Sequence, residues 1–204
     1  MGGVTRRRFL QIGGTLSASA VLAACIGGGS TKRSRDSSGG ARGRQADATI
    51  VRTLSSVETA AVVVYTRVID AGLLSTPVPS ELGEHFRSHH QEHAELFRRT
   101  TADLGGRPFT DPNAVVMQQL EPRLDTLGDE ATALRVVFDV ETILADTYQA
   151  TMGTFADKSF NVAAMSVGGA EARHAAAIAP SIGLSPAPQA LASPDRAVPA
   201  GNGV

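Results

Sequence analysis

The stretch VETAAVVVY at residues 57–65 recurs in similar form as VETILADTY at residues 140–148. Each copy places a glutamate seven residues before one of the two tyrosines of the chain: Glu58 before Tyr65, and Glu141 before Tyr148. Seven residues are almost two turns of an α-helix, so the glutamate and the tyrosine lie on one helix face. The repetition therefore predicts two equivalent helices that each carry an acid on the same face.

The face that these residues share is otherwise apolar. Its apolar members are Leu54, Ala61 and Val68 in the first copy, and Leu134, Val137, Leu144 and Met152 in the second. Each glutamate thus occupies a position where a core residue is expected, and a buried carboxylate without a partner is costly. Two interpretations stay open: hydrogen-bonded structural acids, or acids that pair with a metal ion or a proton.

Apolar periodicity and capping residues predict four long helices, over about 47–71, 80–105, 130–156 and 159–179. A proline-containing connection over 107–129, with a short helix near 114–120, separates the two pairs. Abundant alanine and the lack of tryptophan suit closely packed helices rather than a β-sandwich. The expected fold is all-α: an antiparallel four-helix bundle in which one long crossover joins two helical hairpins.

Histidines lie on the inward faces of the second and fourth expected helices. On the second helix these are His93 and one or both of His89 and His90, whereas His85 lies at the edge of the stripe and is expected on the surface. On the fourth helix, Glu171-Ala172-Arg173-His174 places an acid and a histidine on one face, because residues three apart are neighbours on a helix.

Together these motifs resemble the ferritin-like superfamily, whose bundles hold two metal ions between carboxylates and histidines. The resemblance covers all four helices, about residues 47–179, and implies five metal ligands: Glu58, His93, Glu141, Glu171 and His174. One position departs, because His90 stands where the family has a glutamate three residues before the histidine. The run His-His-Gln-Glu-His also resembles secreted, twin-arginine-dependent ferritin-like proteins of actinobacteria.

The departure changes the charge of the implied site. Three carboxylates leave a pair of divalent ions short by one negative charge, so the number of ions, one or two, stays open. His90 is favoured as the sixth ligand because it aligns with Glu171, with His89 as an alternative or additional ligand. The imidazoles favour iron or manganese, with zinc and copper as alternatives, over calcium or magnesium. Tyr65 and Tyr148 are expected to hydrogen-bond the glutamates.

The N-terminus predicts export from the cytoplasm. Arg6 and Arg7 fit a twin-arginine signal, and the apolar stretch 12–24 that follows is too short for an ordinary membrane span. The motif Leu-Ala-Ala-Cys that ends at Cys25 matches a bacterial lipobox. We therefore expect delivery by the twin-arginine translocase, removal of residues 1–24 and lipidation of Cys25, the only cysteine, in preference to a buried or stray thiol.

Composition divides the rest of the chain into three parts. Residues 25–46, rich in glycine, serine and basic side chains, are expected to form a flexible tether. A lipid next to a basic segment gives durable anchoring to an anionic membrane, and a plain solvated linker is the alternative. Residues 47–180 are the expected bundle, and the Pro/Ala-rich tail 181–204 is predicted to be disordered. The expected location is the extracytoplasmic face of the cell membrane.

Three functions stay open, and so does the question of whether the protein is an enzyme. They are a metal-dependent oxidase or peroxide-consuming enzyme, metal sequestration without turnover, and a metal-free bundle that acts as an interaction module at the cell surface. Residues 47–180 contain no recognisable phosphate-binding loop, nucleophile elbow or basic patch with aromatic residues. Nucleic-acid binding is therefore not expected.

Overall fold

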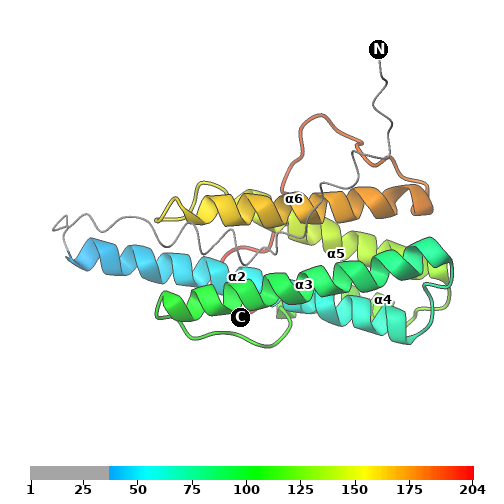
Figure 1. Cartoon of the computed structure of the whole chain (residues 1–204), viewed down its shortest axis with the longest axis horizontal. Coiled ribbons are helices and arrows are strands. Elements are labelled where there is room, and N and C mark those ends of the chain that lie inside the picture. The colour runs from blue at the N-terminus through cyan, green and yellow to red at the C-terminus, as the bar shows by residue number, and fades with distance from the viewer. Residues whose placement is uncertain (1–36) are drawn as a thin grey trace, which may run out of the picture. The chain divides into compact units, whose positions relative to one another are not determined.

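The computed structural model describes residues 37–204, and their regular elements are all helical (Figure 1). The elements are α2 (Ser37–Asp70), α3 (Pro77–Asp103), α4 (Ala114–Leu124), α5 (Glu130–Thr151), α6 (Phe160–Ile178) and the short 3-10 helix η2 (Ala179–Ile182). The predicted signal peptide, Cys25 and the first part of the expected tether lie outside the described residues.

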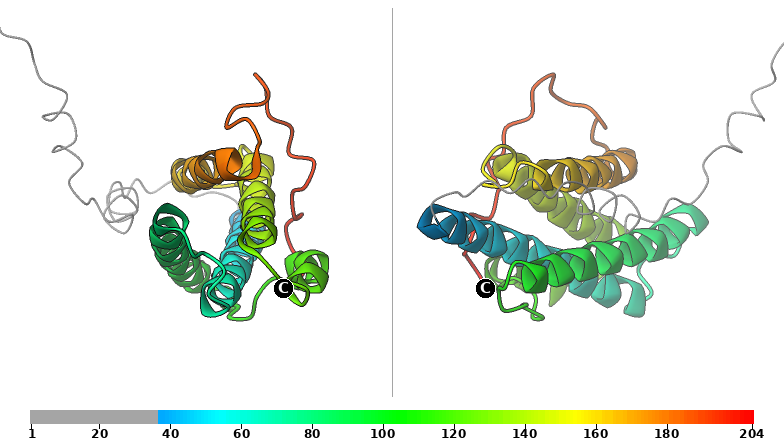
Figure 2. Two further views of the ribbon diagram at one scale, coloured as in Figure 1. Left: turned by 90° about the vertical axis from the view of Figure 1, so that its right-hand side faces the viewer. Right: turned by 60° about the vertical axis from the view of Figure 1, so that its left-hand side comes forward.

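The four long helices α2, α3, α5 and α6 lie side by side around a common interior (Figures 1 and 2). The connection between α3 and α5 contains α4, which packs on the outside against α2 and α5. The predicted all-α bundle with two hairpins and one long crossover is therefore confirmed, including the short helix within the crossover.

The first helix begins earlier than the sequence analysis expected. Residues 37–46, assigned there to the flexible tether, are the first turns of α2. The predicted helix start, Asp47, lies inside α2, and its buried carboxylate accepts hydrogen bonds from the backbone N–H groups of Ala156 (2.7 Å) and Asp157 (2.9 Å). Asp47 thus caps the turn after α5, and Gly43 packs there, since a Cβ on Gly43 would lie 3.0 Å from Ala156.

Two other boundaries differ for local reasons. The helix α3 starts at Pro77, because proline is tolerated in a first turn whose N–H groups have no intrahelical acceptor. Glu130 accepts hydrogen bonds from the backbone of Ser75 and Thr76 just before that turn. The helix α5 ends at Thr151 rather than near residue 156. Shortly after this end, Gly153 adopts a left-handed conformation with φ of 78°, which is typical of a helix end.

The C-terminal tail differs most from the expectation of disorder. The guanidinium of Arg196 forms an ion pair with Asp139 on α5 (2.7 Å), and Val198 is buried. The backbone of Gly201 donates to Thr53 on α2. Gly203 passes so close to Asn113 that an added Cβ would lie 2.4 Å from the Asn113 side chain. Composition does not predict these contacts, because they depend on single residues among the prolines of the tail and after them.

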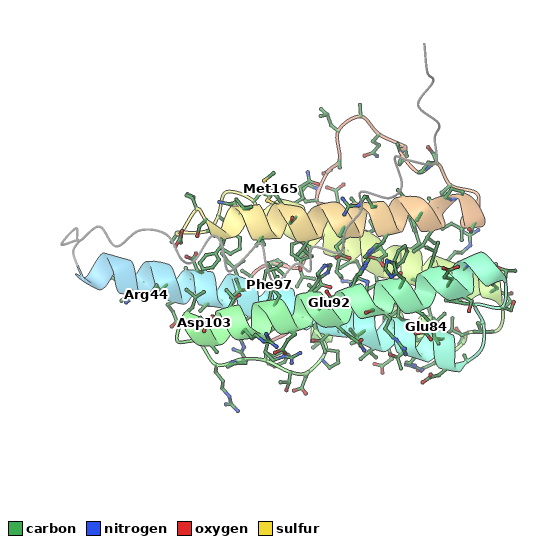
Figure 3. All side chains as sticks on the ribbon, viewed as in Figure 1. Arg44, Glu84, Glu92, Phe97, Asp103 and Met165 are labelled. Atoms are coloured by element: carbon green, nitrogen blue, oxygen red, sulfur yellow. The ribbon has the colours of Figure 1, made fainter. Side chains whose placement is uncertain are left out.

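The apolar core forms two clusters at different levels of the bundle. On α2, one cluster includes Ile50, Val51 and Leu54, and the other begins at Val57. In Figure 3, Phe97 lies between the helices and Met165 lies on the outer side of α6, in agreement with their exposed fractions of 3% and 63%. The residues of α2 from 39 to 70 are long and apolar enough for a membrane span, but 72% of the most apolar window is buried in the bundle, as expected of a core helix.

Candidate metal centre

Six polar side chains from four helices meet inside the bundle. They are Glu58 from α2, His90 and His93 from α3, Glu141 from α5, and Glu171 and His174 from α6. The three glutamates and His90 have no solvent exposure, and the other two histidines are at most 7% exposed. The structure thus brings together all six residues that the sequence analysis named as ligands.

His90 lies at the middle of this cluster. Its Nδ1 atom is 2.8 Å from Oε2 of Glu58 and 3.5 Å from Oε2 of Glu171, while its Nε2 atom is 3.1 Å from Oε1 of Glu141. One imidazole ring therefore contacts all three carboxylates. Because both ring nitrogens face carboxylate oxygens, only a doubly protonated ring can donate to both sides at once.

His93 and His174 each lie close to His90, with ring centroids 6.3 Å and 5.4 Å from that of His90. Nδ1 of His93 is 3.0 Å from Oε1 of Glu171 and 3.6 Å from Oε1 of Glu58. Nδ1 of His174 is 3.3 Å from Oε2 of Glu141 and 3.4 Å from Oε2 of Glu171. His93 and His174 therefore both contact Glu171, and each also contacts one further glutamate.

Three atoms at the heart of the cluster lack hydrogen-bond partners within residues 37–204. They are Nδ1 of His93 and both carboxylate oxygens of Glu171. The 3.0 Å separation of His93 Nδ1 from Glu171 allows attraction, but the groups are not aligned for a hydrogen bond. A buried polar atom left unpaired costs about 1–3 kcal/mol. Once His93 releases its proton, the unshared electron pairs of these three atoms fit a cation.

The tyrosines hydrogen-bond the glutamates crosswise. The hydroxyl of Tyr65 donates to Glu141 at 2.5 Å, and the hydroxyl of Tyr148 donates to Glu58 at 2.5 Å. Each tyrosine therefore contacts the glutamate of the other repeat, which requires α2 and α5 to run antiparallel. The sequence analysis predicted the tyrosine–glutamate contact but not which repeat supplies each partner.

His89 lies outside the cluster. It belongs to neither of the two groups of four side chains that could hold a metal ion. Its Nδ1 atom is 3.0 Å from Nε2 of His174, on the opposite side of that ring from the carboxylates. The ring of Phe86 also stacks on His174, with centroids 4.0 Å apart. Of the two alternatives on α3, the structure places His90 rather than His89 among the carboxylates, and His85 is exposed as expected.

The cluster strongly perturbs its own protonation equilibria. Burial acts to raise the pKa of Glu58, but the positive charges of His93 and His90 outweigh it and lower that pKa to about 2. Burial acts to lower the pKa of His93, but the carboxylates of Glu58 and Glu171 raise it to about 10. Burial and the charge of Glu58 raise the pKa of Glu171. Without a metal ion, protons therefore balance much of the carboxylate charge.

Two overlapping sets of four side chains could each hold a metal ion. One is Glu58, His90, His93 and Glu171, and the other is His90, Glu141, Glu171 and His174, with the ligand atoms of each set within 4.8 Å of one another. Mixed imidazole and carboxylate ligands suit iron, manganese, zinc or copper. Because His90 and Glu171 occur in both sets, the sets compete for ligands.

A model of the ferritin-like domain matches residues 46–184 of the chain, which is most of the described part. The chain belongs to the ferritin-like family. Comparisons with curated proteins and with solved structures found no match. The helical bundle and the buried histidine and glutamate cluster of this ferritin-like domain agree with that assignment and are compatible with metal binding.

A small cavity of about 40 Å³ adjoins the cluster of this ferritin-like domain. Its walls are mostly apolar and include Tyr65, Leu82, Phe86, Leu134 and Ile178. Two of these residues also contact the cluster, since Tyr65 donates to Glu141 and Phe86 stacks on His174. Sequence periodicity places such residues on inward faces, but it contains no signal for an unfilled space between them.

Proposed function

We propose that this ferritin-like domain binds one or two transition-metal ions in the bundle through Glu58, His90, His93, Glu141, Glu171 and His174. The observation that carries the proposal is the set of unpaired buried atoms on His93 and Glu171, which lie among further carboxylates. If these buried side chains were only structural, we would expect all of their polar atoms to form hydrogen bonds. Metal ligands, by contrast, keep lone pairs that are free to bind the ion.

Metal analysis of the purified full chain tests this proposal. We expect Glu58→Gln with Glu141→Gln to lose iron or manganese that the wild type retains after dialysis. Glu92→Gln is the matched control, because Glu92 lies beside His93 in the sequence but is exposed. A folded wild-type chain that takes up no transition metal would contradict metal binding and favour a metal-free interaction module.

The cavity beside Tyr65 favours reaction with a small oxidant over simple sequestration. A bound redox-active ion would supply electron transfer to dioxygen or peroxide. The protein would hold the oxidant against apolar walls, and the Tyr65 hydroxyl would hold the Glu141 carboxylate in place. With excess ferrous ion, sustained oxygen consumption at an oxygen electrode supports an oxidase, and sustained loss of added hydrogen peroxide without oxygen present supports a peroxide-consuming enzyme. Turnover that stops after one filling supports sequestration.

We also propose that the mature protein is attached by a lipid on Cys25 to the extracytoplasmic face of the cell membrane. The supporting features are the twin arginines, the lipobox and the basic residues that follow it. Membrane fractionation should show loss of anchoring in Cys25→Ala and loss of export in Arg6→Lys with Arg7→Lys. Unchanged processing and membrane retention in both variants would refute this location.

A further inference from the structure

Three histidines follow one another at four-residue intervals along α3. They are His85, His89 and His93, and Figure 3 marks this part of the helix with Glu84 and Glu92. Residues four apart are neighbours on a helix, so the three side chains form a row on one face. Their exposure falls along the row: His85 is exposed, His89 is half-buried and His93 is buried.

Short contacts connect the outer end of this row to the metal centre. The rings of His85 and His89 have centroids 4.1 Å apart. Nδ1 of His89 lies 3.0 Å from Nε2 of His174, and the other nitrogen of His174 lies 3.3 Å from Glu141. The contacts thus form a continuous path of imidazoles from solvent to the buried carboxylates.

Apart from the contact of His89 with His174, the described contacts of His85 and His89 are with aromatic and imidazole rings. No ion pair within residues 37–204 includes either of them, whereas every buried histidine contacts a carboxylate. Two imidazoles one helical turn apart can both bind one ion, as paired histidines do on zinc-binding helices. Imidazole ligands select zinc, copper, nickel, cobalt or iron rather than calcium or magnesium.

The residual exposure of the buried centre lies next to this row of histidines. Its three glutamates and His90 are completely buried, and the only residual exposure among the six ligands is on His93 and His174, at 7% and 4%. His89 lies against both of these rings, with its centroid 6.3 Å from that of His93 and 5.2 Å from that of His174. An ion held at His89 is therefore next to the most accessible ligands.

We propose that His85 and His89 form a second metal site, which captures a divalent transition ion at the surface and passes it to the buried centre by way of His174. The transfer step rests on the proposed function of that centre, whereas the surface site does not. The site differs from the six-residue centre because it has no carboxylate and faces solvent. Its occupant would be bound weakly and exchange rapidly.

Rapid mixing of Co²⁺ with the full chain, purified without a histidine tag, tests the proposal. The visible absorption of Co²⁺ distinguishes an enclosed site of few ligands from an exposed, hydrated one. We expect His85→Ala to slow filling of the buried centre by about 10-fold or more, since loss of a neighbouring group typically costs about 10–100-fold in metal affinity. The final stoichiometry of the buried centre should not change. Ser88→Ala, an exposed change on the same helix, should fill like the wild type.

A direct count of the surface ion completes the test. With Cu²⁺ in excess, the wild type should show, in addition to any signal from the buried centre, a second paramagnetic resonance signal with splitting from two imidazole nitrogens, and His85→Ala and His89→Gln should each lose only that second signal. Absence of that signal in the wild type would overturn the surface site. Equal filling rates in His85→Ala and the wild type would overturn the transfer. A wild type that shows the Cu²⁺ signal but never fills the enclosed site would contradict the proposed function and the transfer, and would leave the surface site supported.

Discussion

Replacement of His90 by glutamate should increase the number of ions that the centre holds from one to two. The three glutamates carry three negative charges, so two divalent ions leave one excess positive charge inside the bundle. One ion in either set, together with a proton on the histidine that this set does not use (His174 or His93), leaves no net charge. His90→Glu supplies the fourth carboxylate at a position whose side chain already lies 2.8–3.5 Å from the other three.

The size of the effect follows from Coulomb's law. A unit negative charge about 4 Å from the single excess positive charge of a two-ion centre stabilises that charge by about 4 kcal/mol at an effective dielectric constant of about 20. That energy corresponds to roughly a thousandfold decrease in the Kd of the second ion. Anaerobic calorimetric titration with Fe²⁺ or Mn²⁺, together with elemental analysis, measures both affinity and stoichiometry.

The control for this experiment is His90→Gln, which removes the imidazole but adds no charge. We expect it to bind no more ions than the wild type. The metal-free His90→Glu protein should be less stable than the wild type, because its added carboxylate lacks a counter-charge, and metal should restore its melting temperature. Equal titrations of the two variants, or two tightly bound ions in the wild type, would refute the charge argument.

Three further predictions concern the protein without metal. Tyr65→Phe removes the donor to a buried carboxylate and should lower the free energy of unfolding in urea by about 1–3 kcal/mol; an unchanged value would mean that this hydrogen bond contributes nothing net. Folding raises the pKa of His93 from 6.5 to about 10, so the contribution of His93 to the free energy of unfolding is present below pH 6.5 and lost as the pH rises toward 10. That of Glu58, whose pKa falls from 4.5 to about 2, is present above pH 4.5 and lost as the pH falls toward 2. Thermal melting should thus be highest between pH 4.5 and 6.5, and a steady increase up to pH 9 would contradict these shifts. Gly168→Ala places a methyl group 2.6 Å from an atom of α5 and should destabilise the fold by about 1–3 kcal/mol, whereas Gly169→Ala, with its nearest atom at 3.7 Å, should be neutral or stabilising; equal melting temperatures would contradict the close approach.

The sequence predicted the bundle and the residues of the site because both depend on helical periodicity. Glu58, Glu141 and Glu171 interrupt apolar helix faces, and the apolar face of a helix packs toward the interior of the bundle. Spacing also distinguished His93 from its exposed neighbour Glu92. These features are local, because in a helix the spacing between residues sets the direction in which each side chain points.

Helix ends and the tail were less predictable because they depend on contacts between distant residues. Aspartate is a residue type that often starts a helix. The carboxylate of Asp47 instead accepts hydrogen bonds from the backbone of Ala156 and Asp157, in the turn after α5. The tail has the composition of a disordered segment, yet Arg196 and Val198 attach it to α5. Periodicity contains no information on which distant backbone group a single polar side chain meets.

The crosswise tyrosine contacts explain why both repeats use the same spacing. In an antiparallel pair of helices, Tyr65 can meet Glu141 while Tyr148 meets Glu58 only if each tyrosine is the same number of residues from its own glutamate. The repeated sequence is therefore a requirement of a twofold arrangement between α2 and α5. On α3 and α6 the corresponding pairs are His90 with His93 and Glu171 with His174, so His90 is the ligand that breaks the symmetry. If the proposed metal binding holds, this loss of one carboxylate makes the two sets of ligands unequal, and we expect the first ion to prevent the second from binding tightly.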